Sequence, residues 1–102
     1  KYWRIEHPTG LPIYMTNKRN FFRVEHNNCS FVVVTLSGND QNTIVGLKNQ
    51  HDKYEVHFDC PIVYGVHQMC AAQRAAFIRN KIPFISNGKR YFLPFLGIKK
   101  DR

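Results

Sequence analysis

Two short apolar runs limit what this chain can fold into more than any other feature. The first, Phe31–Leu36, holds three consecutive valines and is apolar at both odd and even positions, which is typical of a central strand covered on each side. The second, Pro61–Val66, begins with a proline that cannot continue a helix and is strongly apolar. We expect the two runs to lie side by side inside a sheet that is sandwiched between helices.

The residues around these runs predict two helices. Apolar or half-polar side chains recur at spacings of three and four and predict one helix over about residues 40–58; they are Ile44, Leu47, His51, Tyr54 and Phe58. An alanine-rich segment predicts a second helix over about 70–81. If the two strands are parallel neighbours, their connection should be right-handed.

Further strands are predicted on both sides of this unit. Residues 1–10 are interpreted as a lead-in, and Leu11–Thr16 as a first strand joined through a polar turn to an alternating strand, Phe21–His26. Asn27-Asn28 and Asn87-Gly88 are turn signals. The second turn joins Pro83–Ser86 to Lys89–Leu93, and Pro94 and Gly97 end that last strand. The prediction is an α/β fold, with α+β as the alternative: a mixed sheet of about six strands in the order β-β-β-α-β-α-β-β, with two helices packed on it.

Length and composition indicate one domain over residues 1–102, which we expect to be a piece of a longer protein. The chain is 43% hydrophobic, which is enough to form a core. Its three cysteines cannot all pair with one another, which indicates a reducing compartment, and no run is long enough to span a membrane. The expected location is the cytoplasm, without membrane contact.

The charge balance points to a polyanionic partner. Fifteen Lys and Arg residues stand against seven Asp and Glu, a formal net charge of +8, and a basic surface of this kind is a common property of nucleic-acid-binding domains. Two stretches, 17–23 and 89–92, mix cations with aromatic residues, so that cations could hold phosphates while rings stack on bases. The alternative is that the rings are core positions and the charges a solvated face. The candidate contacts are Lys18, Arg19, Arg23, Lys89 and Arg90.

No residue set matches a catalytic or metal centre. Cys60, His67 and Cys70 have ligand-like spacing but lack a fourth ligand nearby, and a nucleophilic Cys70 next to His67 lacks an orienting carboxylate. The seven acids are scattered, and Glu25 and Asp40 are the ones worth testing for a nuclease. We therefore expect a non-enzymatic protein without metal or cofactor.

Three other features are weaker. His51 and His57 are interpreted as surface or boundary residues of the long helix. The loop at Gly38 follows the central strand, where α/β folds often bind anions or small effectors. Its glycines are too sparse for a nucleotide-binding fingerprint.

Residues 72–97 carry a family resemblance. Gln73-Arg74, Ile82-Pro83-Phe84 and Leu93-Pro94-Phe95-Leu96-Gly97 resemble a segment of bacterial MarR-like winged-helix transcriptional regulators, in which an α/β region precedes a DNA-binding winged helix. The likeness is clearest over these residues and extends more weakly back to Leu11. It implies an N-terminal domain that senses, dimerises or supports DNA contact. It supplies no catalytic residue, and no helix-turn-helix follows Gly97 in this chain.

The sequence thus predicts a non-enzymatic regulatory or dimerisation domain of a bacterial transcription regulator that assists nucleic-acid binding. The alternative is a nuclease-like α/β domain acting on nucleic acid. A third hypothesis is a protein-interaction module that pairs with a second copy of the chain through a sheet edge or the first hairpin.

Overall fold

The two apolar runs form neighbouring parallel strands at the centre of a mixed sheet, as predicted. The computed structural model describes residues 1–6, 8–38, 42–87 and 89–100. In it the runs are β3 (Cys29–Leu36) and β4 (Ile62–Val66), in a register that pairs Val32 with Ile62 and Leu36 with Val66. The interior position of both strands is therefore confirmed.

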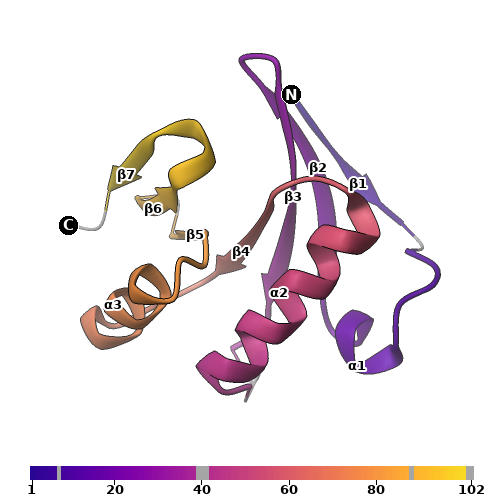
Figure 1. The fold of residues 1–102 in the computed structure, drawn as a ribbon. Coiled ribbons are helices and arrows are strands. Elements are labelled where there is room, and N and C mark those ends of the chain that lie inside the picture. Colours follow the sequence, from indigo (N-terminus) through magenta and orange to yellow (C-terminus); the bar gives the residue numbers. More distant parts are fainter. Residues whose placement is uncertain (7, 39–41, 88, 101–102) are drawn as a thin grey trace.

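The sheet has seven strands, which lie side by side in the same order as in the sequence (Figure 1). The pairs β3–β4 and β4–β5 are parallel, and the other neighbouring strands are antiparallel. The α/β class and the mixed sheet agree with the prediction, with one more strand and one more helix than expected.

The N-terminal part differs most from the prediction. Strand β1 (Tyr2–Ile5) lies at the edge of the sheet and pairs with β2 (Asn20–His26), in a segment that was expected to be a lead-in. The predicted strand at Leu11–Thr16 is wrong, because Pro12 precedes a single helical turn, α1 (Ile13–Thr16). That turn places Met15 in the core, fully buried. An apolar run this short does not reveal its period from sequence alone.

Both turn signals join strands as predicted. Asn27 and Asn28 adopt φ of 50° and 64° between β2 and β3, and Asn87 adopts φ of 55° between β5 (Phe84–Ser86) and β6 (Arg90–Leu93). Gly88 lies outside the described residues. The chain does not stop at β6: a 3₁₀ turn, η1 (Pro94–Leu96), leads to β7 (Ile98–Lys100), which pairs with β6.

Two helices connect the three parallel strands. Helix α2 (Ile44–Phe58) is capped at its N-terminus by Thr43, whose Oγ1 accepts the N–H of Gly46 at 3.0 Å, and at its C-terminus by Asp59, which adopts the left-handed conformation. Its predicted start near residue 40 falls outside the described residues, and the helix itself begins at 44. Helix α3 (Ala71–Arg79) is slightly shorter than predicted, and Lys81 adopts φ of 58° just beyond it.

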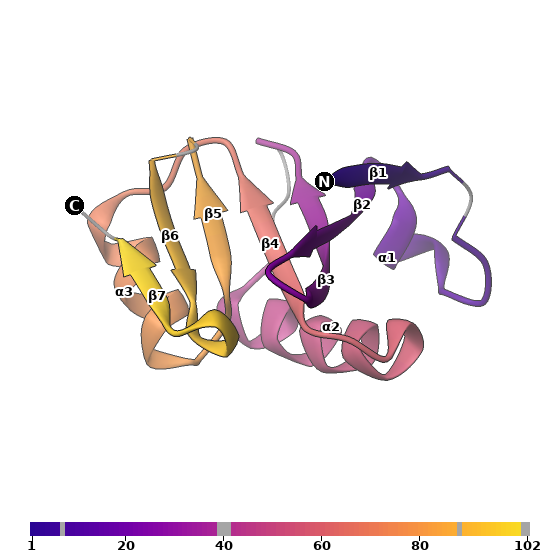
Figure 2. The same cartoon turned by 90° about the horizontal axis from the view of Figure 1, so that it is seen from above.

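Both helices lie on one side of the sheet, which corrects the expectation of a sheet sandwiched between helices (Figure 2). The reason is the strand order. From β3 to β4 and from β4 to β5 the chain steps in the same direction, and right-handed connections that step in one direction put their helices on one face. The main core lies on this face, where residues of all three helices meet alternate residues of the strands; it includes Met15, Leu47, Tyr54, Phe77, Val32, Val34, Ile62, Tyr64 and Phe84.

The opposite face of the sheet carries no α-helix in the described part of the chain but has a smaller apolar cluster of its own. Phe31, Val63 and Leu93 are buried there. The 3₁₀ turn partly covers them, with the ring of Phe95 packed edge-on against Phe31 at 5.2 Å between centroids. Since strand side chains alternate between faces, the unbroken apolar run Phe31–Val34 of β3 is explained by two cores, one on each side.

Candidate nucleic-acid interface

The five basic residues predicted to bind nucleic acid fall into two separate places. Lys18 and Arg19 come just before β2, and Arg23 lies within that strand. Lys89 comes just before β6, and Arg90 is the first residue of β6. Strands β3, β4 and β5 separate β2 from β6. The two predicted stretches therefore do not form one continuous surface.

Arg19 is held inside the protein. Its side chain is 7% exposed, and its Nη1 donates to Gln50 Oε1 at 2.6 Å and to the hydroxyl of Tyr54 at 2.7 Å. The Tyr54 hydroxyl in turn donates to the carbonyl oxygen of Met15. The guanidinium thus joins α1, β2 and α2, which indicates a structural role and leaves little of it for an external phosphate.

Arg23 is also partly withdrawn from solvent. Its Nη1 lies 3.4 Å from Ser30 Oγ and 4.0 Å from Cys60 Sγ. Lys18, by contrast, is exposed between α1 and β2, where it adopts φ of 59°. Of the three N-terminal candidates, Lys18 is the one with a free approach from solvent.

The two C-terminal candidates lie at the β5–β6 hairpin. Lys89 is exposed and Arg90 is half-buried. The Nε of Arg90 is buried, and no hydrogen-bond partner faces it among the described residues. A buried donor without an acceptor is uncommon in folded proteins, so this guanidinium is the strongest local sign of a missing anionic or carbonyl partner.

The charge of the chain is concentrated at this same end of the sheet. Residues 60–100 contain seven Lys and Arg and no Asp or Glu, whereas residues 1–59 contain seven Lys and Arg and six Asp and Glu. Residues 60–100, which we call the basic end, comprise β4 to β7 together with α3. The total charge alone does not show this division, but the positions of the acidic residues in the sequence do.

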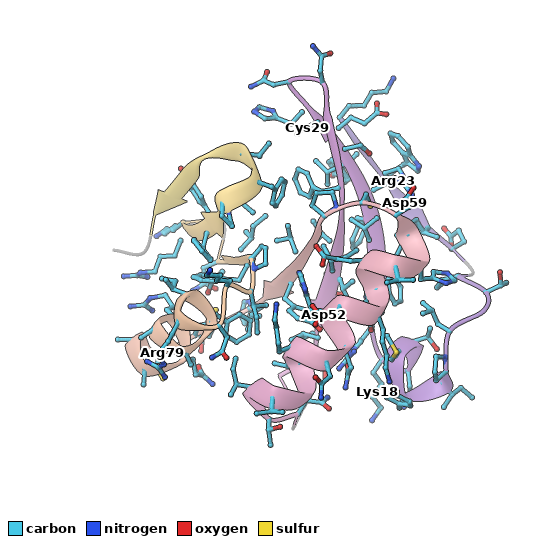
Figure 3. The ribbon with its side chains drawn as sticks, viewed as in Figure 1. Lys18, Arg23, Cys29, Asp52, Asp59 and Arg79 are labelled. Atoms are coloured by element: carbon cyan, nitrogen blue, oxygen red, sulfur yellow. The ribbon has the colours of Figure 1, made fainter. Side chains whose placement is uncertain are left out.

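Among the residues of the basic end whose side chains are described, three cations are exposed: Arg79, Lys81 and Lys89. Arg79 lies in the last turn of α3 and is labelled in Figure 3, and Lys81 follows that helix directly. Arg74, by contrast, makes a hydrogen bond within the protein: its Nη1 donates to the carbonyl oxygen of Met69 at 2.8 Å. Exposed positive charge is therefore available along α3 and at the β5–β6 hairpin.

The cysteine and histidine side chains whose spacing resembled a metal site do not form one in the described residues. In the described ranges, Cys60, His67 and Cys70 do not bring three ligand atoms together. Burial raises the pKa of the Cys60 thiol, an effect that the nearby Arg23 guanidinium opposes. Cys70 is exposed at the start of α3, where its backbone N–H donates to Gln73 Oε1 at 2.9 Å.

The acids considered for a nuclease do not form a centre either. Glu25 is exposed at the end of β2, where its backbone pairs with Lys1. Asp40 lies outside the described residues. Across the described chain, the one converging group of three metal-ligand side chains involves neither of them; it consists of His51, Asp52 and Glu55 on α2.

The loop at Gly38 borders a cavity of about 310 Å³ at the carboxyl ends of β3 and β4. Its walls come from α2, α3 and the strand ends, with apolar residues such as Leu36, Leu47 and Phe77 and amides such as Gln68 and Gln73. This is the position at which α/β folds often take ligands. The described lining carries no charged side chain, so the cavity does not suit the anion considered from the sequence.

A second hollow lies on the face without helices. A groove of about 350 Å³ runs beside Val24, Phe31, Tyr91 and Leu96, with Lys1 and Glu25 among its other lining residues. On β1, Tyr2 is 72% exposed. This apolar face is a candidate contact surface of a different kind from the basic end.

Fold and site together define a two-layer α/β domain with a basic end. Compared with protein-family models, curated proteins and solved structures, the chain gives no significant match. Within the described residues, no helix is both long enough and apolar enough to cross a membrane.

Proposed function

We propose that this domain is a non-enzymatic part of a transcription regulator, in which the basic end contacts the phosphates of DNA. The observation that carries the proposal is the absence of any Asp or Glu from residues 60–100, a segment that contains seven Lys and Arg. Positive charge without local compensation attracts a polyanion through its phosphates and releases counterions.

The half-buried side chain of Arg90 supports the same reading. Its Nε is enclosed and cannot itself reach a phosphate, but the residue is partly exposed, and Arg pairs with phosphate through short, charge-assisted hydrogen bonds. Lys89, its neighbour in the chain, is exposed and offers a further contact.

The contacts proposed are with the DNA backbone rather than with base edges. Among the described elements, α2 and α3 are separated by β4, so they do not form the closely joined helix pair of a helix-turn-helix. Backbone contacts position a protein on DNA without reading its sequence. The resemblance of residues 72–97 to MarR-like regulators supports a regulatory role, with base reading left to a winged helix elsewhere in a longer protein, in the cytoplasm.

The test is the salt dependence of binding to a short DNA duplex, measured by fluorescence anisotropy. Each phosphate contact contributes about 0.9 to the slope of log K against log salt. Replacing Arg79, Lys81 and Lys89 together by Gln should lower that slope by up to about 2.7 if all three touch phosphates.

The matched control removes three positive charges away from the basic end, by replacing Lys1, Lys48 and Lys53 with Gln. It should leave the slope nearly unchanged, because Lys1 precedes the edge strand β1 and the two other residues lie on α2. Equal losses in both triple variants would show a general charge effect and reject a localised interface. Absence of binding by the unmodified chain at low salt would reject the proposal outright.

A second candidate role, pairing with another copy of the chain, is favoured by the apolar groove on the helix-free face. Leu96 and Tyr91 line it and are only half-buried. Sedimentation equilibrium should show a dimer that Leu96→Asp dissociates, while Val56→Asp, at an 84% exposed position on α2, does not. A monomer at every concentration would exclude this role.

A further inference from the structure

A histidine in the middle of α2 is buried in an unusual setting. His51, interpreted from sequence as a surface or boundary residue, is 3% exposed, and its ring packs beside Tyr64 with 6.2 Å between centroids. Its Nε2 lies 3.0 Å from the carbonyl oxygen of Ile62, the first residue of β4. Since a carbonyl oxygen can only accept, Nε2 carries the hydrogen and donates it.

The other ring nitrogen faces two carboxylates. In the neutral ring, Nδ1 then presents a lone pair, and it lies 3.5 Å from Asp52 Oδ1 and 3.8 Å from Glu55 Oε1. All three ligand atoms lie within 4.8 Å of one another. In this tautomer the buried nitrogen is an acceptor that faces two carboxylate oxygens, and a cation placed between them would satisfy all three.

We propose that His51 Nδ1, Asp52 and Glu55 bind a divalent transition-metal ion of the zinc type. Zinc bonds to nitrogen and carboxylate oxygen are about 2.0–2.2 Å long, which puts tetrahedral neighbours roughly 3.3–3.5 Å apart. The separations of 3.5 and 3.8 Å from Nδ1 need only small movements of the carboxylates. Both are on the surface, at 59% and 45% side-chain exposure, and can turn toward an ion.

The second ring nitrogen of His51 is held in the way that is common for histidine ligands of metal ions. Histidine ligands commonly donate their second ring N–H to a carbonyl or carboxylate, which fixes the tautomer and the ring direction. Ile62 provides that acceptor here. An imidazole ligand favours zinc, cobalt or nickel over magnesium and calcium, which prefer all-oxygen sites. Water would complete the coordination on the solvent side.

The ammonium group of Lys48 would compete with a metal ion for the carboxylate of Asp52. Its Nζ lies 3.4 Å from Asp52 Oδ1, one helical turn away, in an exposed pair. A metal ion must draw Asp52 away from this ammonium group. Removal of the Lys48 charge should therefore strengthen metal binding, which is a directional expectation that a purely structural cluster does not make.

The experiment titrates the full chain with Zn²⁺ by calorimetry and with Co²⁺ by visible absorption. We expect one ion per chain, with cobalt bands that lack a thiolate charge-transfer component. Asp52→Asn and Glu55→Gln should each weaken binding at least tenfold, and Lys48→Gln should strengthen it. The control is Asp59→Asn, which removes one negative charge just after the same helix and should leave the affinity within about twofold.

The rival occupant of the site is a proton on Nδ1. Nitrogen-detected NMR of His51 distinguishes the two, because zinc should shift Nδ1 while Nε2 keeps its hydrogen. An imidazolium signal that zinc does not change would overturn the proposal. So would equal weakening by Asp59→Asn, or no effect of Glu55→Gln. These outcomes are independent of DNA binding, so the proposal stands or fails separately from the proposed function.

Discussion

The helix-free face of the sheet makes a quantitative prediction about stability. Val63 and Val34 lie on the adjacent strands β4 and β3 and are both fully buried, but they belong to clusters on opposite faces. If the smaller cluster around Phe31 and Leu93 is a true core, truncation of Val63 should cost as much as truncation of Val34.

The magnitude follows from the groups removed. Val63→Ala deletes two methyl-sized groups, worth about 1.6 kcal/mol in transfer free energy. The cavity left behind raises the expected loss to about 2–3 kcal/mol. For a domain whose whole free energy of unfolding is about 5–15 kcal/mol, that is a large fraction.

The assay is urea unfolding followed by circular dichroism. Val63→Ala and Val34→Ala should each lower the free energy of unfolding by about 2–3 kcal/mol with unchanged m-value, and so move the midpoint by about 1–2 M. Val56→Ala, at an 84% exposed position on α2, should change it by less than about 0.5 kcal/mol. A loss at Val63 as small as that at Val56, beside a full loss at Val34, would refute a second core.

Two further predictions concern single side chains. Tyr64→Phe removes a buried hydroxyl that donates to the carbonyl oxygen of Leu47 at 2.7 Å, and should cost about 0.5–1.5 kcal/mol in the same unfolding assay; no loss would mean that the hydrogen bond adds nothing to stability. Because burial raises the pKa of the Cys60 thiol, less of it is thiolate at pH 8, so iodoacetamide should modify Cys60 more slowly than exposed Cys70, and its rate should keep rising above the pH at which an ordinary thiol levels off. Mass spectrometry of the labelled peptides measures both rates, and faster labelling of Cys60 would contradict the expected shift.

The central part of the fold was predictable because its signals are local. The valine run of β3 and the three- and four-residue spacing in α2 each indicate their structure within a few residues. The pairing of β1 with β2 joins segments about twenty residues apart and depends on tertiary packing, so no local pattern shows it. The side on which the helices pack depends on strand order, which is likewise a property of the whole sheet.

Some features of the candidate sites were likewise visible in the sequence, and others depend on tertiary packing. The basic end could have been recognised from the sequence, because residues 60–100 contain no Asp or Glu. The burial of Arg19 could not, since it depends on Gln50 and Tyr54 of α2 lying over the start of β2. His51 and Glu55 are four residues apart and visibly share a helix face, but the carbonyl of Ile62 that fixes the ring belongs to another strand.

The agreement between chain order and spatial order has a consequence for how the domain is made. Each strand lies next to the one synthesised just before it, so no strand has to be inserted between two that have already paired. Three of the six strand pairs join residues within 15 positions of each other, and in the other three the separation does not exceed 30, so loop-closure entropy opposes each addition only moderately. The sheet can therefore grow in one direction while the chain leaves the ribosome, with β1 as its first edge and the positively charged strand β7 as its last.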